Sequence, residues 1–276
     1  MDRMQVWAAD RKSVELVIAN DAWPMEQMGA DWWTIEFPER DTDVDYFFRL
    51  DRSDTLPDPR SKFQPQGVFG PSRLVNLDEF TWHDHAFQAR PLSAAVIYEM
   101  HVGTFTSKGT FEAAIDKLQH LSRLGVTHLE LMPVAEFAGK RGWGYDGVFP
   151  YAPHHTYGGP DGLARLVDAC HQEGIGVILD VVYNHLGPAG NHLAQFGPYF
   201  TDRHRTPWGS AINFDAAYSD EVRRFFVDNA TMWLRDYHFD GLRLDAIHAI
   251  LPHSHSLNNW RKKSKPLRPT WGATSC

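Results

Sequence analysis

Two different hydrophobic patterns divide the chain near residue 90. Before that point, short stretches of alternating apolar and polar residues are separated by polar turn residues. Strands are expected at 4–8, 13–18, 32–37 and 44–50. Short strands at this spacing are typical of a small β-sandwich. The stretch that follows, residues 56–72, contains four prolines and two glycines, so we expect an irregular connector there.

From residue 94 onward, apolar strands alternate with stretches of helical periodicity. Strands are expected at 95–100, which should be buried, and at 128–132, 176–180 and 241–245. Helices are expected at 111–124, 161–173 and 220–237. This alternation predicts parallel strands, and long insertions at 133–159 and 181–219 follow two of them. Loops in these places form the active site in (β/α)8 barrels. Four strands make half a barrel, so the predicted fold is α/β, an N-terminal β-sandwich followed by an incomplete (β/α)8 TIM barrel containing strands 1–4 only.

These patterns predict three segments: 1–90 as the β-sandwich module with its connector, 91–250 as the first half of the barrel, and 251–276 as an aberrant tail. Pro252–Cys276 contains five of the 27 basic residues, none of the 35 acidic residues and no apolar period. One interpretation is a solvated basic tail. The interpretation that we favour is translation out of frame after about Ile250, because this segment conflicts with the pattern before it. Synonymous codons for 257–273, read from the third base, can encode Glu-Gln-Leu-Ala-Glu-Glu-Val-Lys-Ala, which would suit the helix after a fourth strand.

Composition narrows the classes of function. The net charge of −8 makes a general nucleic-acid or acidic-membrane surface unlikely. Two cysteines exclude a disulfide framework, and neither an apolar run of about 20 residues nor a signal-peptide core is present, so the cytoplasm is expected. Ten Trp, 17 Phe and nine Tyr suit either sugar stacking or a large core, and composition does not choose between them.

Charged and polar residues follow two of the expected strands. Asp180-Val181-Val182-Tyr183-Asn184-His185 ends one strand, and Gly241-Leu242-Arg243-Leu244-Asp245-Ala246 ends the next. Alternation places Arg243 and Asp245 on the same side, where the arginine would keep the carboxylate ionised as a nucleophile. The alternative is a buried Arg–Asp pair that only holds the strand, since buried charges are normally paired.

Together, the two motifs resemble two signature regions of the α-amylase family of glycoside hydrolases, in the same order and on the corresponding strands. The resemblance implies that Asp245 is the nucleophile that forms the glycosyl-enzyme. It implies that Arg243 orients and ionises Asp245, and that His185 binds the sugar in the cleaved subsite. Asn184 and Asp180 would support that site.

Two further positions match the family. Gly142-Trp143-Gly144-Tyr145-Asp146 resembles the segment that bears an aromatic residue after strand 2, so Tyr145 would stack under the sugar. The alternative for Tyr145 is a packing role in the core or loop. His248, three residues after Asp245, lies where family members place a residue on the leaving-group side.

Within this family, residues 3–250 are most similar to the maltooligosyltrehalose trehalohydrolases. The similar stretches include Tyr98–Thr106, Leu131–Phe137, Tyr151–His155, Phe196–Phe200 and Thr206–Gly209. The resemblance implies cleavage of the α-1,4 bond next to the terminal trehalose of maltooligosyltrehalose, with a glucan-binding type of module in front. Two alternatives remain: a fragment of a 1,4-α-glucan branching or isoamylase-type debranching enzyme, and a non-catalytic glucan-binding fragment.

The catalytic set of the family is incomplete in these 276 residues. Retaining glycosidases need a second carboxylic acid about 5–5.5 Å from the nucleophile. The family places this general acid, a Glu, after strand 5, and a further Asp with its neighbouring His after strand 7. No residue of the chain corresponds to them, so we expect the chain as written to be inactive. No cofactor and no catalytic metal are expected, because no histidine pair has zinc-type spacing on one helix.

Overall fold

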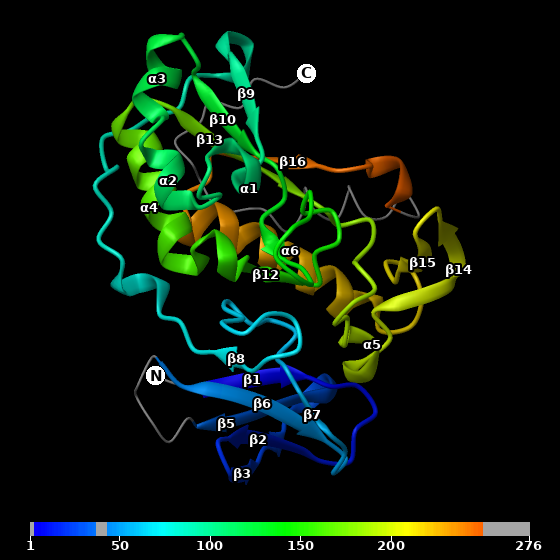
Figure 1. The fold of residues 1–276 in the computed structure, drawn as a ribbon. Coiled ribbons are helices and arrows are strands. Elements are labelled where there is room, and N and C mark those ends of the chain that lie inside the picture. Colours follow the sequence, from blue (N-terminus) through cyan, green and yellow to red (C-terminus); the bar gives the residue numbers. More distant parts are fainter. Residues whose placement is uncertain (1–2, 37–42, 251–276) are drawn as a thin grey trace.

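The computed structural model describes residues 3–36 and 43–250. The expected tail at 251–276 lies outside these residues. Figure 1 shows antiparallel sheets from the first part of the chain lying below an α/β layer formed by the later part. The chain between them runs along one side of the molecule from β8 to β9.

The N-terminal part contains two antiparallel sheets. The first consists of β1 (Arg3–Trp7), β5 (Trp32–Glu36) and β4 (Glu26–Gln27). The second consists of β3 (Asp21–Pro24), β2 (Val14–Ile18), β6 (Asp45–Leu50), β7 (Thr55–Leu56) and β8 (Ser72–Arg73). Alternation in β6 buries Tyr46, Phe48 and Leu50 on one face. The segments expected to form strands do so, except that Phe37 lies outside the described residues, and β3, β4, β7 and β8 are additional strands too short to show a pattern.

The α/β layer is built on four parallel strands. In spatial order they are β16 (Gly241–Leu244), β13 (Gly176–Val181), β10 (His128–Leu131) and β9 (Ile97–Met100). All three neighbouring pairs are parallel, as the alternation of strands and helices predicts. The chain contributes α1 (Val102–Phe105), α2 (Phe111–Ile115), α3 (Leu118–Arg123), α4 (Gly159–Gln172), α5 (Leu193–Phe196) and α6 (Ser219–Asp236).

Two hairpins lie in the long insertions. They are β11 (Ala135–Glu136) with β12 (Phe149–Pro153), and β14 (Phe200–Thr206) with β15 (Gly209–Ile212). Short 3₁₀ turns occur at Gly29–Asp31, Leu77–Glu79, Leu92–Ala94, His155–Tyr157 and Ile247–Ala249.

The two long helices follow from local sequence. In α4, Pro160 occupies the first turn, where its missing N–H costs no hydrogen bond, and Leu163, Leu166, Val167 and Cys170 form one fully buried stripe. In α6, acidic residues lie in the first turn and Arg235 in the last, which complements the helix dipole.

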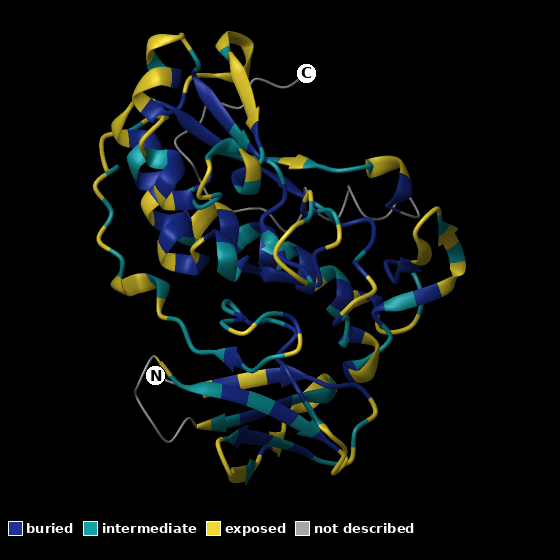
Figure 2. Ribbon diagram, viewed as in Figure 1, coloured by how far each residue is buried: buried dark blue, intermediate teal, exposed yellow. Residues whose placement is uncertain are grey.

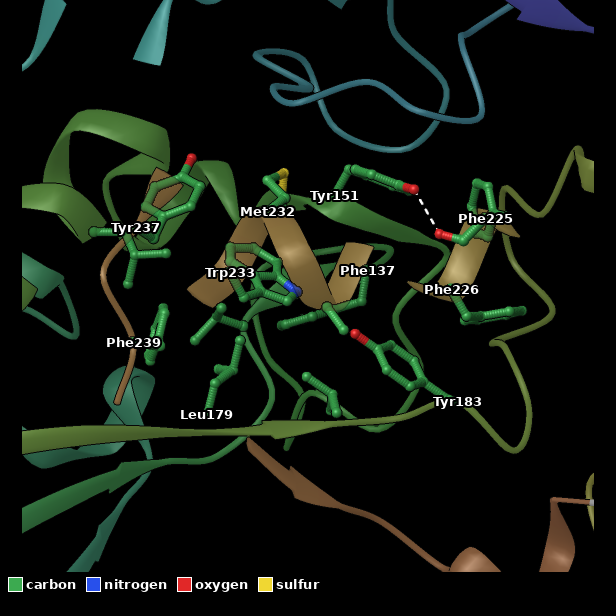
Figure 3. Packing of buried hydrophobic residues seen from close by; sticks show 14 of the residues in the cluster. Phe137, Tyr151, Leu179, Tyr183, Phe225, Phe226, Met232, Trp233, Tyr237 and Phe239 are labelled. Carbon is green, nitrogen blue, oxygen red and sulfur yellow. Dashed lines mark hydrogen bonds between the residues drawn. The ribbon is translucent and has the colours of Figure 1, made fainter. Parts of the chain in front are cut away.

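One face of the parallel sheet packs against the helices. Figure 3 shows Trp233 and Phe226 of α6 beside Leu179 of β13 and Tyr183. All four side chains are buried. Because side chains alternate along a strand, Asp180 and Arg243 project from the opposite face.

The expected burial of the strand at 95–100 is wrong for most of its length. Ile97 is 43% exposed and Tyr98 is 38% exposed, and Figure 2 shows β9 coloured as exposed. The reason is position, because β9 is an edge strand with one pairing neighbour, β10, among the described residues. The helix expected at 111–124 is also interrupted, since α2 ends before Asp116 and α3 begins at Leu118.

One hydrophobic core joins the N-terminal sheets to the α/β layer. Arg60 of the connector lies between them, with its guanidinium carbon 5.4 Å from the ring of Trp32 on β5 and 5.4 Å from that of Phe225 on α6. Trp32 also donates a hydrogen bond from Nε1 to Glu221 over 3.1 Å. In the part of the chain that the structure describes, no helix has the length and apolarity needed to cross a bilayer.

Candidate active site

The ends of β13 and β16 bring three of the candidate residues together. Asp180 and Arg243 are register partners on these neighbouring strands. Arg243 Nη1 lies 2.7 Å from Asp180 Oδ2 and 2.8 Å from Asp245 Oδ1. The predicted placement of Arg243 and Asp245 on the same side is therefore confirmed, and the arginine bridges two carboxylates.

Asp245 is held from a second direction. Its backbone N–H donates to the carbonyl of Val181 over 3.0 Å, which continues the pairing of the two strands. Asn184 Nδ2 donates to the Asp245 carbonyl over 2.9 Å and to Oδ2 over 3.3 Å. Each carboxylate oxygen of Asp245 thus has its own donor, which fixes the orientation of the group.

Asp180 lies beneath this arrangement with a fully buried side chain. Burial raises the pKa of Asp180, and its hydrogen bond with Arg243 opposes that rise. Tyr145 donates its hydroxyl to the same Oδ2 over 3.1 Å, and burial together with Asp180 raises the pKa of Tyr145 to about 12. Tyr145 is therefore a stable donor at neutral pH.

Tyr145 owes its position to the preceding glycine. Gly144 has φ +93°, and a Cβ there would lie 2.0 Å from the carbonyl oxygen of Pro133. Only glycine lets the loop pass this close to the end of β10.

His185 occupies the other side of the site. Its Nδ1 pairs with Asn184 Oδ1 at 2.5 Å, and burial lowers the pKa of His185, which favours the neutral ring. The indole of Trp208, on the β14–β15 hairpin, is stacked parallel to the imidazole with centroids 4.5 Å apart and an angle of 10°. Sequence reasoning gave Trp208 no role, although it lies in one of the stretches that carried the resemblance.

His248 is the predicted site residue that the structure does not bring to this group. It is exposed, in the turn Ile247–Ala249. Within 3–36 and 43–250, no hydrogen bond or ion pair joins it to the other candidates. Its role stays a prediction.

Two more carboxylates share the sheet face with Asp180. Glu130 on β10 is the register partner of Glu99 on β9. Burial raises the pKa of Glu130, and the charges of Asp180 and Glu99 raise it further. This face therefore carries the carboxylates of Glu99, Glu130 and Asp180 beside the cation of Arg243.

The arrangement is chemically that of a fixed carboxylate beside donors and aromatic rings. Asp245 is ordered by Arg243 and Asn184. The ring of Tyr145 is hydrogen-bonded to Asp180, and the ring of Trp208 is stacked on His185. Aromatic faces suit the apolar faces of sugars, and an oriented carboxylate suits nucleophilic attack.

The sequence profile of the alpha amylase catalytic domain matches residues 59–197, half of the chain.

The chain belongs to the α-amylase family.

Comparison with individual members refines this assignment. A malto-oligosyltrehalose trehalohydrolase of Saccharolobus solfataricus is 47% identical over 250 residues, covering 90% of this chain and 44% of that protein. A 1,4-alpha-glucan branching enzyme of Corynebacterium jeikeium is 31% identical, covering 92% of this chain and 39% of that protein. The chain thus spans less than half the length of these relatives.

A solved structure agrees with the family. The crystal structure of an alpha amylase candidate from Salmonella typhimurium superposes with a TM-score of 0.90 at 43% identity, covering 95% of this chain and 45% of that one. The chain accordingly has an α/β fold that includes part of a TIM barrel.

Proposed function

We propose that the chain is the front part of a maltooligosyltrehalose trehalohydrolase, a retaining glycoside hydrolase that releases trehalose by cleaving the α-1,4 bond next to the terminal trehalose. The observation that carries the proposal is the Asp245 carboxylate, held by Arg243 and Asn184 at the ends of neighbouring parallel strands of an α-amylase family chain. The 47% identity to a trehalohydrolase, against 31% to a branching enzyme, supports the choice of substrate.

Each residue has a role in this proposal. Asp245 attacks the anomeric carbon as the bond to the leaving O4 breaks, and a carboxylic acid protonates that oxygen. Water then hydrolyses the glycosyl-enzyme with the same acid acting as base. Arg243 keeps the Asp245 carboxylate ionised and oriented. His185 and Tyr145 bind the sugar in the cleaved subsite.

The remaining positions act through these residues. Asp180 holds Arg243 and Tyr145, and Asn184 holds Asp245 and His185. His248 is assigned to the leaving-group side. The general acid is assigned to a Glu after a fifth strand. Glu99 and Glu130 are not assigned this role, because they lie on β9 and β10, the first two strands of the sheet.

The domain organisation is part of the proposal. Strands β9, β10, β13 and β16 are assigned as strands 1–4 of a (β/α)8 barrel over residues 91–250. The two N-terminal sheets, with the connector, are assigned as a β-sandwich of glucan-binding type over residues 1–90. The partner is maltooligosyltrehalose or another α-1,4-glucan, and the location is the cytoplasm.

A chimera tests the activity. Residues 1–250 are joined to the corresponding later part of the Saccharolobus solfataricus relative, and the product is assayed on maltooligosyltrehalose, amylose and amylopectin. Release of trehalose from the first substrate alone supports the proposal. Branching of amylose or debranching of amylopectin would instead support the alternative enzymes. Glucan binding without turnover by a folded chimera would support a non-catalytic module.

A further inference from the structure

A second cluster of chemically active side chains lies outside the candidate active site. Glu136 is on β11, and His154 and His155 directly follow its antiparallel partner β12. His154 Nδ1 and His155 Nδ1 each lie 2.9 Å from Glu136 Oε1. One donor atom from each residue lies within 4.8 Å of the others, the one such grouping of three metal-type side chains in the described part of the chain.

The surroundings of the His154 ring are unusual for a buried histidine. Its side chain is fully buried, and so is that of Glu136. Despite the short distance to Glu136, neither ring nitrogen of His154 makes a hydrogen bond within 3–36 and 43–250. Buried polar atoms nearly always have a partner, so this ring lacks one that the site should supply.

The ring is also fixed in place. Phe137 stacks on it, with centroids 3.9 Å apart and an angle of 27°, and the edge of Tyr157 packs against it at 4.8 Å. The backbone N–H of His154 donates to the carbonyl of Val134 over 2.8 Å. Packing therefore keeps Nδ1 within 2.9 Å of Glu136 Oε1 without a hydrogen bond to hold it there.

We propose that Glu136, His154 and His155 form a structural site for one divalent transition-metal ion of the zinc class. Two imidazole nitrogens and one carboxylate are a common ligand set for such ions. Around a tetrahedral zinc ion, with bonds of about 2.0–2.1 Å, ligand atoms lie about 3.3 Å apart. Each of the two distances between Glu136 and a histidine nitrogen needs to lengthen by only about 0.4 Å to reach that spacing. His155 is 23% exposed, so the site borders on solvent, which could supply a water molecule as the fourth ligand.

The site would act on the loop that carries Tyr145. Glu136 and His154 lie at the two ends of residues 137–153, and Gly142–Asp146 is inside this loop. An ion bound at the base would tie both ends together, so the ordering of Tyr145 and the stability of the hairpin would depend on it. Sequence reasoning missed the cluster because Glu136 and His154 lie 18 residues apart, on one strand and just after its partner, without a helical spacing.

Zinc titration of the chelator-treated 276-residue chain tests the site. We expect one equivalent to bind in calorimetry and to raise the melting temperature, because the ion binds only the folded state. His155→Asn is the main variant, because the His155 side chain is partly exposed and asparagine retains a hydrogen-bond donor for Glu136. It should weaken zinc binding by at least about 10-fold. Glu136→Gln should do the same if it folds.

His204→Asn is the matched control, because His204 also pairs with a carboxylate, Asp215, at 3.0 Å but has no third metal-type ligand among the described residues. Its zinc affinity should equal that of the unmodified chain. With Co²⁺ in place of zinc, the visible absorption of a tetrahedral ion should appear and be lost in His155→Asn. Absence of saturable binding, or equal affinity in His155→Asn, would overturn the proposal and leave Glu136 as a carboxylate that merely receives two histidines.

Discussion

Arg243 Nη1 lies 2.7 Å from Oδ2 of Asp180, a carboxylate with no exposed surface on the neighbouring strand. Removing the arginine would leave a buried charge without its cation. Arg243→Ala should lower the free energy of unfolding by about 2–3 kcal/mol, less than for a fully buried pair because Arg243 is itself partly exposed. Urea denaturation measures this.

The control for that variant is Arg235→Ala, since Arg235 pairs with Asp236 at the surface. Its effect should stay below about 1 kcal/mol. Equal effects of the two substitutions would mean that the charge of Asp180 does not depend on Arg243.

The contacts of His171 predict how the free energy of unfolding changes with pH. Its Nδ1 lies 2.8 Å from Asp84 and its Nε2 lies 3.0 Å from Asp240, while His238 also contacts Asp84. Burial favours the neutral ring, but the hydrogen bonds and charges of Asp240 and Asp84 outweigh it and raise the pKa of His171. This stabilisation is complete below the unfolded-state pKa of about 6.5 and is lost as pH rises through the folded-state value.

The free energy of unfolding should therefore fall as the pH rises above about 6.5. The fall should be smaller in His171→Gln, which keeps a polar side chain but cannot titrate. His120→Asn, on the surface of α3, should keep the slope of the unmodified protein. A slope that His171→Gln leaves intact would assign the pH dependence to another group.

The contacts of Arg60 predict that this residue stabilises the packing of the N-terminal sheets against the α/β layer. Its guanidinium lies over the rings of Trp32, Tyr151 and Phe225 and pairs with Asp228 at 2.8 Å. Arg60→Ala should cost about 2–3 kcal/mol of unfolding free energy. The loss of unfolding free energy in Arg60→Lys should be smaller than in Arg60→Ala but not zero, because lysine restores the charge but not the planar stacking. A lysine variant as unstable as the alanine variant would mean that the stacking alone matters.

The proposed role of Asp245 as nucleophile predicts how its substitution changes the activity of the chimera. In the chimera described above, Asp245→Asn should lower kcat by at least about 10³-fold while substrate binding survives, because the change keeps shape and removes the nucleophilic charge. Product analysis and calorimetry with maltooligosyltrehalose measure the two effects. Near-normal turnover would make Asp245 a structural partner of Arg243, the alternative that its sequence motif left open.

A polypeptide of these 276 residues alone should release no trehalose. It lacks a residue that corresponds to the general acid, which is worth about 10²–10⁴-fold in rate. Clear trehalose release by the purified chain would show that one of its own carboxylates protonates the leaving oxygen.

Sequence pattern predicted the elements with strong periodicity and missed those set by tertiary contacts. The stripe of α4 and the alternation of β6 were visible because each buries one face. The break between α2 and α3 carries no proline or glycine, so nothing local announces it. The exposure of β9 depends on which strands flank it, and its composition alone predicts burial.

The candidate site shows the same division. The pairing of Arg243 with Asp245 follows from a two-residue spacing at the end of one strand, and the sequence predicted it. The stacking of Trp208 on His185 joins a hairpin to a strand end 23 residues away in sequence, and only the fold brings them together.

The large core that runs through both the N-terminal sheets and the α/β layer has a consequence for cooperativity. Neither part can lose its packing without uncovering apolar side chains of the other, so local opening at the contact costs nearly as much as global unfolding. Residues 3–250 should then unfold in one transition, with the signal of the aromatic rings around Arg60 and the signal of the helices lost together.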